Sequence, residues 1–212
     1  MAASKKFTLW CLNNSNADGN VCVYQDVSNV VQSGGTGLCI LAWMVAGANS
    51  GSQIRFAWNT GYQFAWFDDN AHLTQAFKPA ALGDQVTLSR NQFGHQFSPS
   101  ASGTDAQLTI KMDQSVPSAN NIVAGIGMDG AGTFAVAARP NTVATFTPVA
   151  DDALVYWISF GYHGRANQPI TPANMNLPQK ISFPYKVREM TAVYNVDGTW
   201  TMFHGHPSAS GF

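Results

Sequence analysis

The chain has 212 residues and a formal net charge of −1, and only 11% of its residues are charged, whereas about 25% is average for soluble domains. Its basic residues are scattered singly apart from Lys5-Lys6, which excludes the clustered positive surface typical of nucleic-acid-binding proteins, so we expect no nucleic-acid partner. Glu189 is the only glutamate, and a composition this poor in Glu and Lys disfavours surface helices and favours strands joined by turns.

The amino-terminal segment gives no targeting signal. Met1 to Lys6 lacks the apolar stretch of a secretory leader. The longest apolar run, Leu38 to Ala46, is too short to span a bilayer. We therefore expect a protein without a transmembrane segment that is cytoplasmic as encoded, with non-classical secretion or a removed leader left open.

Strand signals begin close to the amino terminus. Phe7–Leu12 and Val21–Gln25 are rich in apolar and β-branched side chains, and the polar stretch between them contains the turn-forming pair Asp18-Gly19. We predict a hairpin here. The next run, Leu38–Ala46, is almost wholly apolar, so we expect either a strand covered on both faces or a short buried helix, which has the same signature.

The clearest alternation lies in Gln53–Phe67, with a turn at Gly61. Large apolar side chains occupy every second position on either side of that turn: Ile54, Phe56, Trp58, Tyr62, Phe64 and Trp66. A period of two residues places these five aromatic rings and one isoleucine on a single face.

Further strand-like runs follow, separated by glycine, proline and asparagine: Gln85–Ser89, Gln107–Met112, Ile122–Met128, Thr133–Ala138, Val143–Thr147, Leu154–Phe160, Lys180–Phe183, Glu189–Tyr194 and Thr199–His204. Asp197-Gly198 predicts a hairpin between the last two. Ser98–Asp105 and the proline-rich His163–Pro178 are predicted to be long loops.

Short strands throughout, with no 3.6-residue apolar stripe, predict an all-β fold, namely an antiparallel two-layer β-sandwich or jelly roll. No change in composition marks a linker. We therefore expect one domain over residues 1–212, with flexible ends at 1–6 and 205–212.

Two segments resemble ligand-binding loops without completing them. Gly125, Gly127 and Gly130 have the spacing of a dinucleotide fingerprint, but a strand-like run follows where a helix is required, so we expect a tight hairpin or bulge. Asn14, Asn16 and Asp18 resemble the start of a calcium loop. Gln25 stands where a bidentate glutamate is required, so a turn is the preferred interpretation and calcium the weaker one.

His204 and His206 would lie on the same face if the last strand continued through them, which is an arrangement used by β-sheet metal sites. A third ligand would have to come from His163, His95 or His72. The acid pairs Asp68-Asp69 and Asp151-Asp152 are interpreted as exposed turns.

Catalytic motifs are weak throughout the sequence. The single glutamate leaves two-carboxylate chemistry unsupported, and no nucleophile elbow or zincin helix is present. We expect a protein without a cofactor that is not an enzyme.

The three cysteines, Cys11, Cys22 and Cys39, all lie in apolar, strand-like runs rather than at metal-ligand spacing. Buried thiols are the preferred interpretation. A disulfide between Cys11 and Cys22, at the two sides of the predicted hairpin, is the alternative, although a reducing compartment would oppose it.

The sequence is rich in aromatic residues, with 6 Trp, 6 Tyr and 13 Phe. Most alternate in phase with aliphatic residues and are expected in the core. Trp43, Tyr162, Tyr185 and Phe67 are out of phase or in loops, so we expect these four to be exposed and available for ligand binding. Aromatic faces with a polar edge suit sugar surfaces and membrane interfaces.

Several short segments together resemble one protein family: Asn13-Asn14-Ser15, Val23-Tyr24-Gln25, Leu41-Ala42-Trp43, Phe56-Ala57-Trp58, Gly125–Met128 continuing to Arg139-Pro140-Asn141, Phe146-Thr147-Pro148, and Tyr156–Gly161. The chain resembles the bacterial rhizosphere-induced proteins of the RhiA type, from about Phe7 to Met202. The resemblance implies an accessory protein of host-associated bacteria, expressed under cell-density control, and supplies no catalytic residues.

We therefore expect a non-catalytic accessory or binding protein that recognises carbohydrate on a host or neighbouring surface. Three alternatives stay open at this point. The aromatic content is compatible with a membrane-active or toxin-like sandwich. The low charge leaves little repulsion between copies, which is compatible with homo-oligomers or a self-assembling structural protein. The last alternative is a hydrolase without a recognisable motif.

Overall fold

The computed structural model describes residues 5–35, 37–68, 75–103, 106–150, 153–175 and 177–210. Within them the chain is built almost entirely of strands, which confirms the predicted all-β class. Two short 3-10 helices interrupt the strands, η1 (Val27–Asn29) and η2 (Pro207–Ser210). No helix in this part of the chain has the length and hydrophobicity required to cross a membrane.

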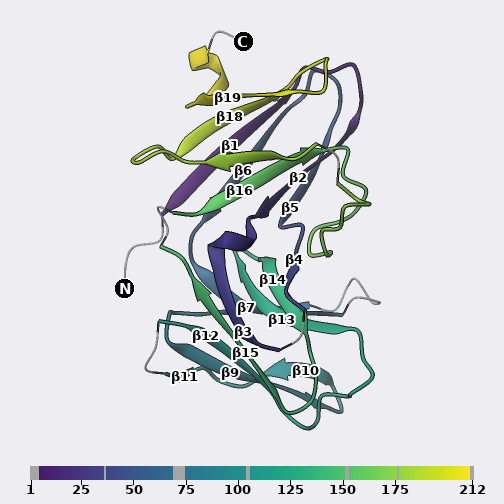
Figure 1. The fold of residues 1–212 in the computed structure, drawn as a ribbon, viewed down its shortest axis with the longest axis vertical. Helices are drawn as coiled ribbons and strands as arrows, with labels where there is room; N and C mark the ends of the chain where they lie inside the picture. The colour runs from purple at the N-terminus through teal and green to yellow at the C-terminus, as the bar shows by residue number, and fades with distance from the viewer. Residues whose placement is uncertain are drawn as a thin grey trace.

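Two four-stranded sheets form the upper half of the molecule in Figure 1. Sheet A has the strand order β19 (Trp200–His204), β18 (Glu189–Tyr194), β1 (Lys6–Asn13) and β6 (Gln53–Asn59). Sheet B has the order β17 (Gln179–Ser182), β16 (Val155–Phe160), β2 (Gly19–Gln25) and β5 (Met44–Ala48). The two sheets enclose one core, which is centred on the fully buried rings of Trp43, Trp58 and Tyr156.

Two larger sheets form the lower half. Sheet C has the order β10 (Gly94–Phe97), β9 (Asp84–Asn91), β12 (Leu108–Met112), β15 (Thr142–Pro148) and β3 (Val30–Gly34), and β11 (Ala101–Ser102) also pairs with β9. Sheet D has the order β4 (Cys39–Ile40), β14 (Ala131–Ala137), β13 (Ile122–Met128), β7 (Tyr62–Asp68) and β8 (Gln75–Pro79). A second core, which includes Phe64, Phe134 and Phe146, lies between them.

The expected sandwich is thus built twice, and the chain passes repeatedly between the two halves. It crosses at β2–β3, β4–β5, β6–β7 and β15–β16. The halves also share contacts, since Trp43 in the upper core donates from Nε1 to the carbonyl oxygen of Met128 at 2.9 Å. Tyr62 packs against both cores. Most strand pairs are antiparallel as predicted, but β1–β18 and β9–β12 are parallel.

One predicted hairpin is wrong, and so is the prediction that the large side chains of Gln53–Phe67 share a single face. β1 pairs with β6 and β18, whereas β2 pairs with β5 and β16, so the segment between β1 and β2 connects the two layers of the upper sandwich. Likewise, β6 belongs to sheet A and β7 to sheet D, so their aromatic rows face different cores. A period of two shows which residues share a face of a strand, but it does not show which sheet the strand joins.

The apolar run 38–46 is also divided. It forms β4 in sheet D and β5 in sheet B, and Leu41, Ala42 and Trp43 between them are buried as the chain crosses. The hairpin predicted around Gly130 is confirmed, because β13 and β14 pair with a bulge between Ile126 and Gly127, and Asp129 and Gly130 have positive φ at the turn. The hairpin β18–β19 is confirmed as well.

Four strands were not predicted: β3, β8, β10 and β11. The predicted loop 163–178 contains no strand in its described residues, and an isolated bridge between Leu41 and Pro169 joins it to the chain just after β4. Some expectations fall on residues outside the described ranges, namely His72, the acid residues Asp69, Asp151 and Asp152, the end of the loop at Asp105, and the termini 1–4 and 211–212.

Candidate functional site

The four aromatic candidates are dispersed, and three of them are buried. The exposed fraction is 1% for Trp43, 0% for Tyr162 and 5% for Phe67. The expectation that these three rings are exposed is therefore wrong, and their faces are not available to a ligand. Tyr185 is 81% exposed, as expected.

Each of the three buried rings has a structural cause for its burial. Trp43 lies where the chain enters sheet B, and it stacks on Tyr156 with 5.9 Å between ring centroids. The loop after β16 folds back over the outer face of sheet B, so that Tyr162 is buried there and its hydroxyl donates to the carbonyl oxygen of Arg165. Burial raises the pKa of Tyr162 to about 12. Phe67 packs on the outer face of sheet D against Phe77.

Tyr185 lies beside a small cavity of about 240 Å³ at one end of the upper sandwich. We call it the aromatic pocket. It is lined by Phe7 at the start of β1, by Leu154 and Tyr156 at the start of β16, and by side chains of the segment 183–188.

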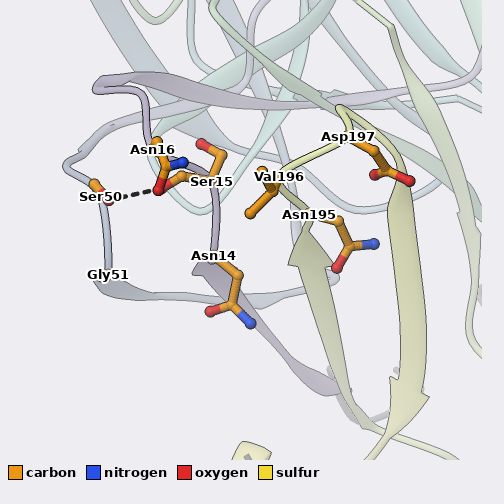
Figure 2. Close-up of a pocket in the computed structure, with 8 residues that line it drawn as sticks. All are labelled: Asn14, Ser15, Asn16, Ser50, Gly51, Asn195, Val196 and Asp197. Carbon is orange, nitrogen blue, oxygen red and sulfur yellow. Dashed lines mark hydrogen bonds between the residues drawn. The ribbon is translucent and has the colours of Figure 1, made fainter.

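A second, larger and more open depression lies at the other end of β1, and most of the residues that line it carry polar side chains. We call it the amide pocket, and Figure 2 shows its three parts: residues 14–16 after β1, the turn 50–51 between β5 and β6, and the hairpin turn 195–197 between β18 and β19. Its volume is about 660 Å³.

Strand pairing in sheet A brings these three segments together. β1 and β18 are parallel, with Asn13 opposite Tyr194, so the residues that follow both strands leave the sheet at the same edge. β6 is antiparallel to β1 with Gln53 opposite Leu12, so the turn that precedes β6 meets the same edge. The pocket therefore results from the order of strands in one sheet.

Buried hydrogen bonds hold the segment 14–18 in place. Asn13 is 1% exposed, and its side-chain amide donates to the carbonyl oxygens of Ala17 at 2.8 Å and Ala48 at 3.0 Å. Its side-chain oxygen accepts from the hydroxyl of Ser15 at 2.6 Å. The hydroxyl of Ser50 donates in turn to the carbonyl oxygen of Ser15 at 2.6 Å. These bonds fix the loop backbone before any ligand arrives.

The side chains of Asn14 and Asn16 are exposed at the pocket. Asn195 lines the same pocket from the hairpin, and its amide nitrogen donates to the hydroxyls of Thr199 and Thr201. Asp197 is the one carboxylate among the lining residues. Hydrogen bonds from the side chain and backbone of Thr199 lower the pKa of Asp197, so its carboxylate is ionised at neutral pH. The pocket thus offers amide donors and acceptors together with one fixed acceptor.

The residues considered as possible metal ligands do not come together at one site. Asp18 accepts from the backbone N–H of Ser50 at 2.8 Å, which is a turn-stabilising contact, and Asn14 and Asn16 project into the amide pocket. β19 ends at His204, and Gly205 has a φ of +86°, so the expectation that His204 and His206 share one strand face is wrong. No group of three His, Cys, Asp or Glu side chains suited to a metal occurs within the described ranges.

His206 packs edge-on against Trp10 with 4.6 Å between ring centroids. Of the other histidines considered as a third ligand, His95 lies against Trp66 of the lower sandwich. The backbone N–H of His163 bonds to the carbonyl oxygen of Asn174.

The three cysteines are thiols rather than disulfides. Cys11 and Cys22 are buried as expected, whereas Cys39 is half-buried. The bridge between Cys11 and Cys22 is wrong because β1 and β2 lie in different sheets, with the two side chains in different apolar clusters.

Sequence reasoning identified the segments 13–20 and 195–198 only as separate turns. The parallel pairing of β1 with β18 brings the two segments together, across more than 170 residues of chain. Ser50 and Gly51, in the turn before β6, had no distinguishing signal in the sequence.

Comparisons with known proteins give one consistent result. The family model described as RhiA matches residues 4–205. The chain is also 26% identical over 210 residues to Protein RhiA of Rhizobium leguminosarum bv. viciae, and the match covers 94% of this chain and 87% of that protein. No solved structure matches the chain.

Proposed function

This chain belongs to the RhiA family of rhizosphere-induced proteins, and from the residues of the amide pocket we propose that it is a non-catalytic binding protein that recognises carbohydrate there. The ligand is a glycan of a host or neighbouring surface, as suits an accessory protein of a host-associated bacterium.

One observation carries the proposal. The exposed amides of Asn14 and Asn16 and that of Asn195 come from two loops and line the same depression. An amide both donates and accepts hydrogen bonds, as does a sugar hydroxyl, so several amides on one surface match a row of hydroxyl groups. The prior fixing of the loop by Asn13 reduces the entropy lost on binding.

The charge and shape of the amide pocket favour a neutral, extended ligand. Asp197 supplies one ionised acceptor, which forms strong hydrogen bonds with hydroxyl groups. Val196 is 68% exposed at the rim and offers an apolar contact for the C–H face of a sugar ring. Because the depression is open, it suits one face of a chain of sugars rather than an enclosed monosaccharide.

The same residues support a non-catalytic role. Hydrolysis of a glycosidic bond ordinarily requires two carboxyl groups, one of them kept protonated by a raised pKa. Asp197 is the single carboxylate lining the pocket, and its pKa is lowered.

The first prediction concerns glycan binding. We expect the protein to bind a subset of plant or bacterial polysaccharides on a glycan array, and the double variant N14A/N16A to bind the best of them about tenfold more weakly or worse. The loss of two neutral hydrogen bonds, each of about 0.5–1.5 kcal/mol, gives a change of this size. Isothermal titration calorimetry with the best array ligand measures it.

Asn121 provides the matched control, because it is an exposed asparagine that precedes β13 in the lower sandwich. N121A should bind as the unmodified protein does. An array without hits, or a hit that N14A/N16A and N121A bind equally well, would remove the carbohydrate proposal.

A further inference from the structure

The aromatic pocket is formed by the same strand order as the amide pocket, but at the opposite edge of sheet A. Thr8 of β1 lies opposite Glu189 of β18, so Phe7 and Arg188, which precede them, meet where the two parallel strands begin. The backbone N–H of Thr8 donates to the carbonyl oxygen of Arg188 at 2.8 Å. Seven residues separate Phe7 from Asn14, and at about 3.3 Å per residue the two pockets lie roughly 23 Å apart.

The walls of the pocket are apolar and fixed. Phe7 and Tyr156 are buried, with exposed fractions of 2% and 1%. The ring of Phe183 packs edge-on against both, with centroid distances of 4.9 Å to Phe7 and 6.0 Å to Tyr156. Rings packed in this way form a fixed aromatic surface at the cavity, against which a flat apolar group can lie.

The rim is cationic. The guanidinium of Arg188 lies 4.8 Å from the centroid of the Phe7 ring, and the ammonium of Lys186 lies 5.3 Å from that of the Tyr185 ring. Neither cation forms an ion pair with a carboxylate of the described residues. The neighbouring carboxylate of Glu189 accepts instead from the indole N–H of Trp10, at 2.8 Å.

Two cations that form no ion pair with a carboxylate of the described residues lie over aromatic rings at this cavity, and together they define the ligand that would fit. We propose that the aromatic pocket binds a small organic anion, namely a carboxylate carried on a single aromatic ring. The ring lies in the cavity against the packed rings of Phe7, Tyr156 and Phe183, and the carboxylate accepts hydrogen bonds from Arg188 and Lys186. A volume of about 240 Å³ is below the roughly 300–1,000 Å³ of pockets for drug-sized molecules, so one ring fills it.

Sodium benzoate is the test ligand, measured by isothermal titration calorimetry with the full chain at pH 7. Benzamide has the same ring and shape without the charge, and benzylamine carries the opposite charge. We expect benzoate to bind, benzamide to bind at least about fivefold more weakly, and benzylamine to give no heat of binding. The double variant K186Q/R188Q should lose about tenfold or more in benzoate affinity, since hydrogen bonds to charged groups are the stronger ones.

R55Q is the matched control. Arg55 also lies over an aromatic ring, 5.6 Å from the centroid of Trp10, but on the exposed face of β6 and outside the aromatic pocket. R55Q should bind benzoate normally. N14A/N16A should as well, so the carbohydrate proposal and this one can fail independently.

Circular dichroism melting curves identify any variant that has unfolded. If K186Q/R188Q is unfolded, the single variant R188Q replaces it, with the same direction of change expected. No heat with benzoate up to 10 mM (about −2.7 kcal/mol in binding free energy), equal binding of benzoate and benzamide, or equal loss in R55Q and the rim variant would each overturn the proposal.

Discussion

Cys11 and Cys22 show how burial controls the chemistry of a single side chain. Both are fully buried, Cys11 in the upper core and Cys22 on the outer face of sheet B under the loop that carries Tyr162. Burial raises the pKa of each thiol to about 12. At pH 8 the thiolate form is then on the order of one in 10⁴, and the thiolate is the reactive species.

We therefore predict that Cys39, which is half-buried, reacts first with a thiol reagent such as 5,5′-dithiobis(2-nitrobenzoate) at pH 8. Cys11 and Cys22 should react only when the protein unfolds, at least about 100-fold more slowly than in 6 M guanidinium. Stopped-flow absorbance with C39S as the control separates the two classes. Rapid reaction of two or more thiols in the folded protein would contradict the burial described above.

Gly125, at the centre of β13, shows how one residue type determines the packing of a strand. A Cβ atom at this position would overlap the backbone carbonyl oxygen of Phe134 on β14. β13 is also paired on its other side with β7, so it cannot move away. The glycine-rich run that resembles a nucleotide loop is therefore explained by the close approach of two strands.

We predict that G125A lowers the free energy of unfolding by about 3 kcal/mol or more, as expected when a buried site is overfilled and the backbone must shift. Gly47 on β5 provides the control, because the nearest atom to its added Cβ is the side-chain oxygen of Asn20 at 3.9 Å. G47A should change the stability by less than about 1 kcal/mol. Urea unfolding followed by circular dichroism measures both, and similar stabilities for the two variants would contradict the packing argument.

Strands were predictable from the sequence where the residues that determine them lie close together in the chain. β13 and β18 were predicted with the bounds that the structure shows, since alternation and a following Asp-Gly turn determine them. β3 and β10 were missed because Gln32, Ser33 and Gln96 interrupt the apolar pattern on the edges of sheet C. Edge strands often carry polar residues on both faces.

Which strands pair with each other was less predictable than where each strand lies in the sequence. Asp18-Gly19 favours a hairpin, yet the polar segment before it crosses between sheets because the side chain of Asn13 satisfies its backbone. The amide pocket depends on the long-range parallel pairing of β1 with β18, which leaves no periodic signal in the sequence. Trp43 was expected outside the core that it occupies because its burial also depends on long-range packing, where the chain crosses from β4 to β5.

At the scale of the whole molecule, the two sandwiches depend on each other. Trp43 bonds to the carbonyl oxygen of Met128, whose side chain lies in the upper core although β13 belongs to the lower half. Gln25 of β2 reaches the same residue, with 3.9 Å between its side-chain nitrogen and the Met128 sulfur. Four crossings of the chain add covalent connections to these contacts. We therefore expect a disruption in either half to destabilise the other.

We predict a single unfolding transition in scanning calorimetry, with equal calorimetric and van't Hoff enthalpies. W43F leaves the Met128 carbonyl without its donor and should cost about 1–3 kcal/mol. It should accelerate hydrogen exchange in β12 of the lower half as well as in β16 of the upper half. W10F, at a half-exposed position on β1, should have a smaller effect, and unchanged exchange in β12 with W43F would show that the halves unfold separately.

The position of β1 between β6 and β18 also determines when the protein can fold during synthesis. β18 begins at Glu189, so β1 is synthesised more than 170 residues before the strand that pairs with it in parallel. At roughly 5–20 residues per second, a ribosome needs on the order of 10–40 s to travel from one to the other. Over that interval β1, with Phe7 and Leu9, lacks the strand that pairs with it on one side.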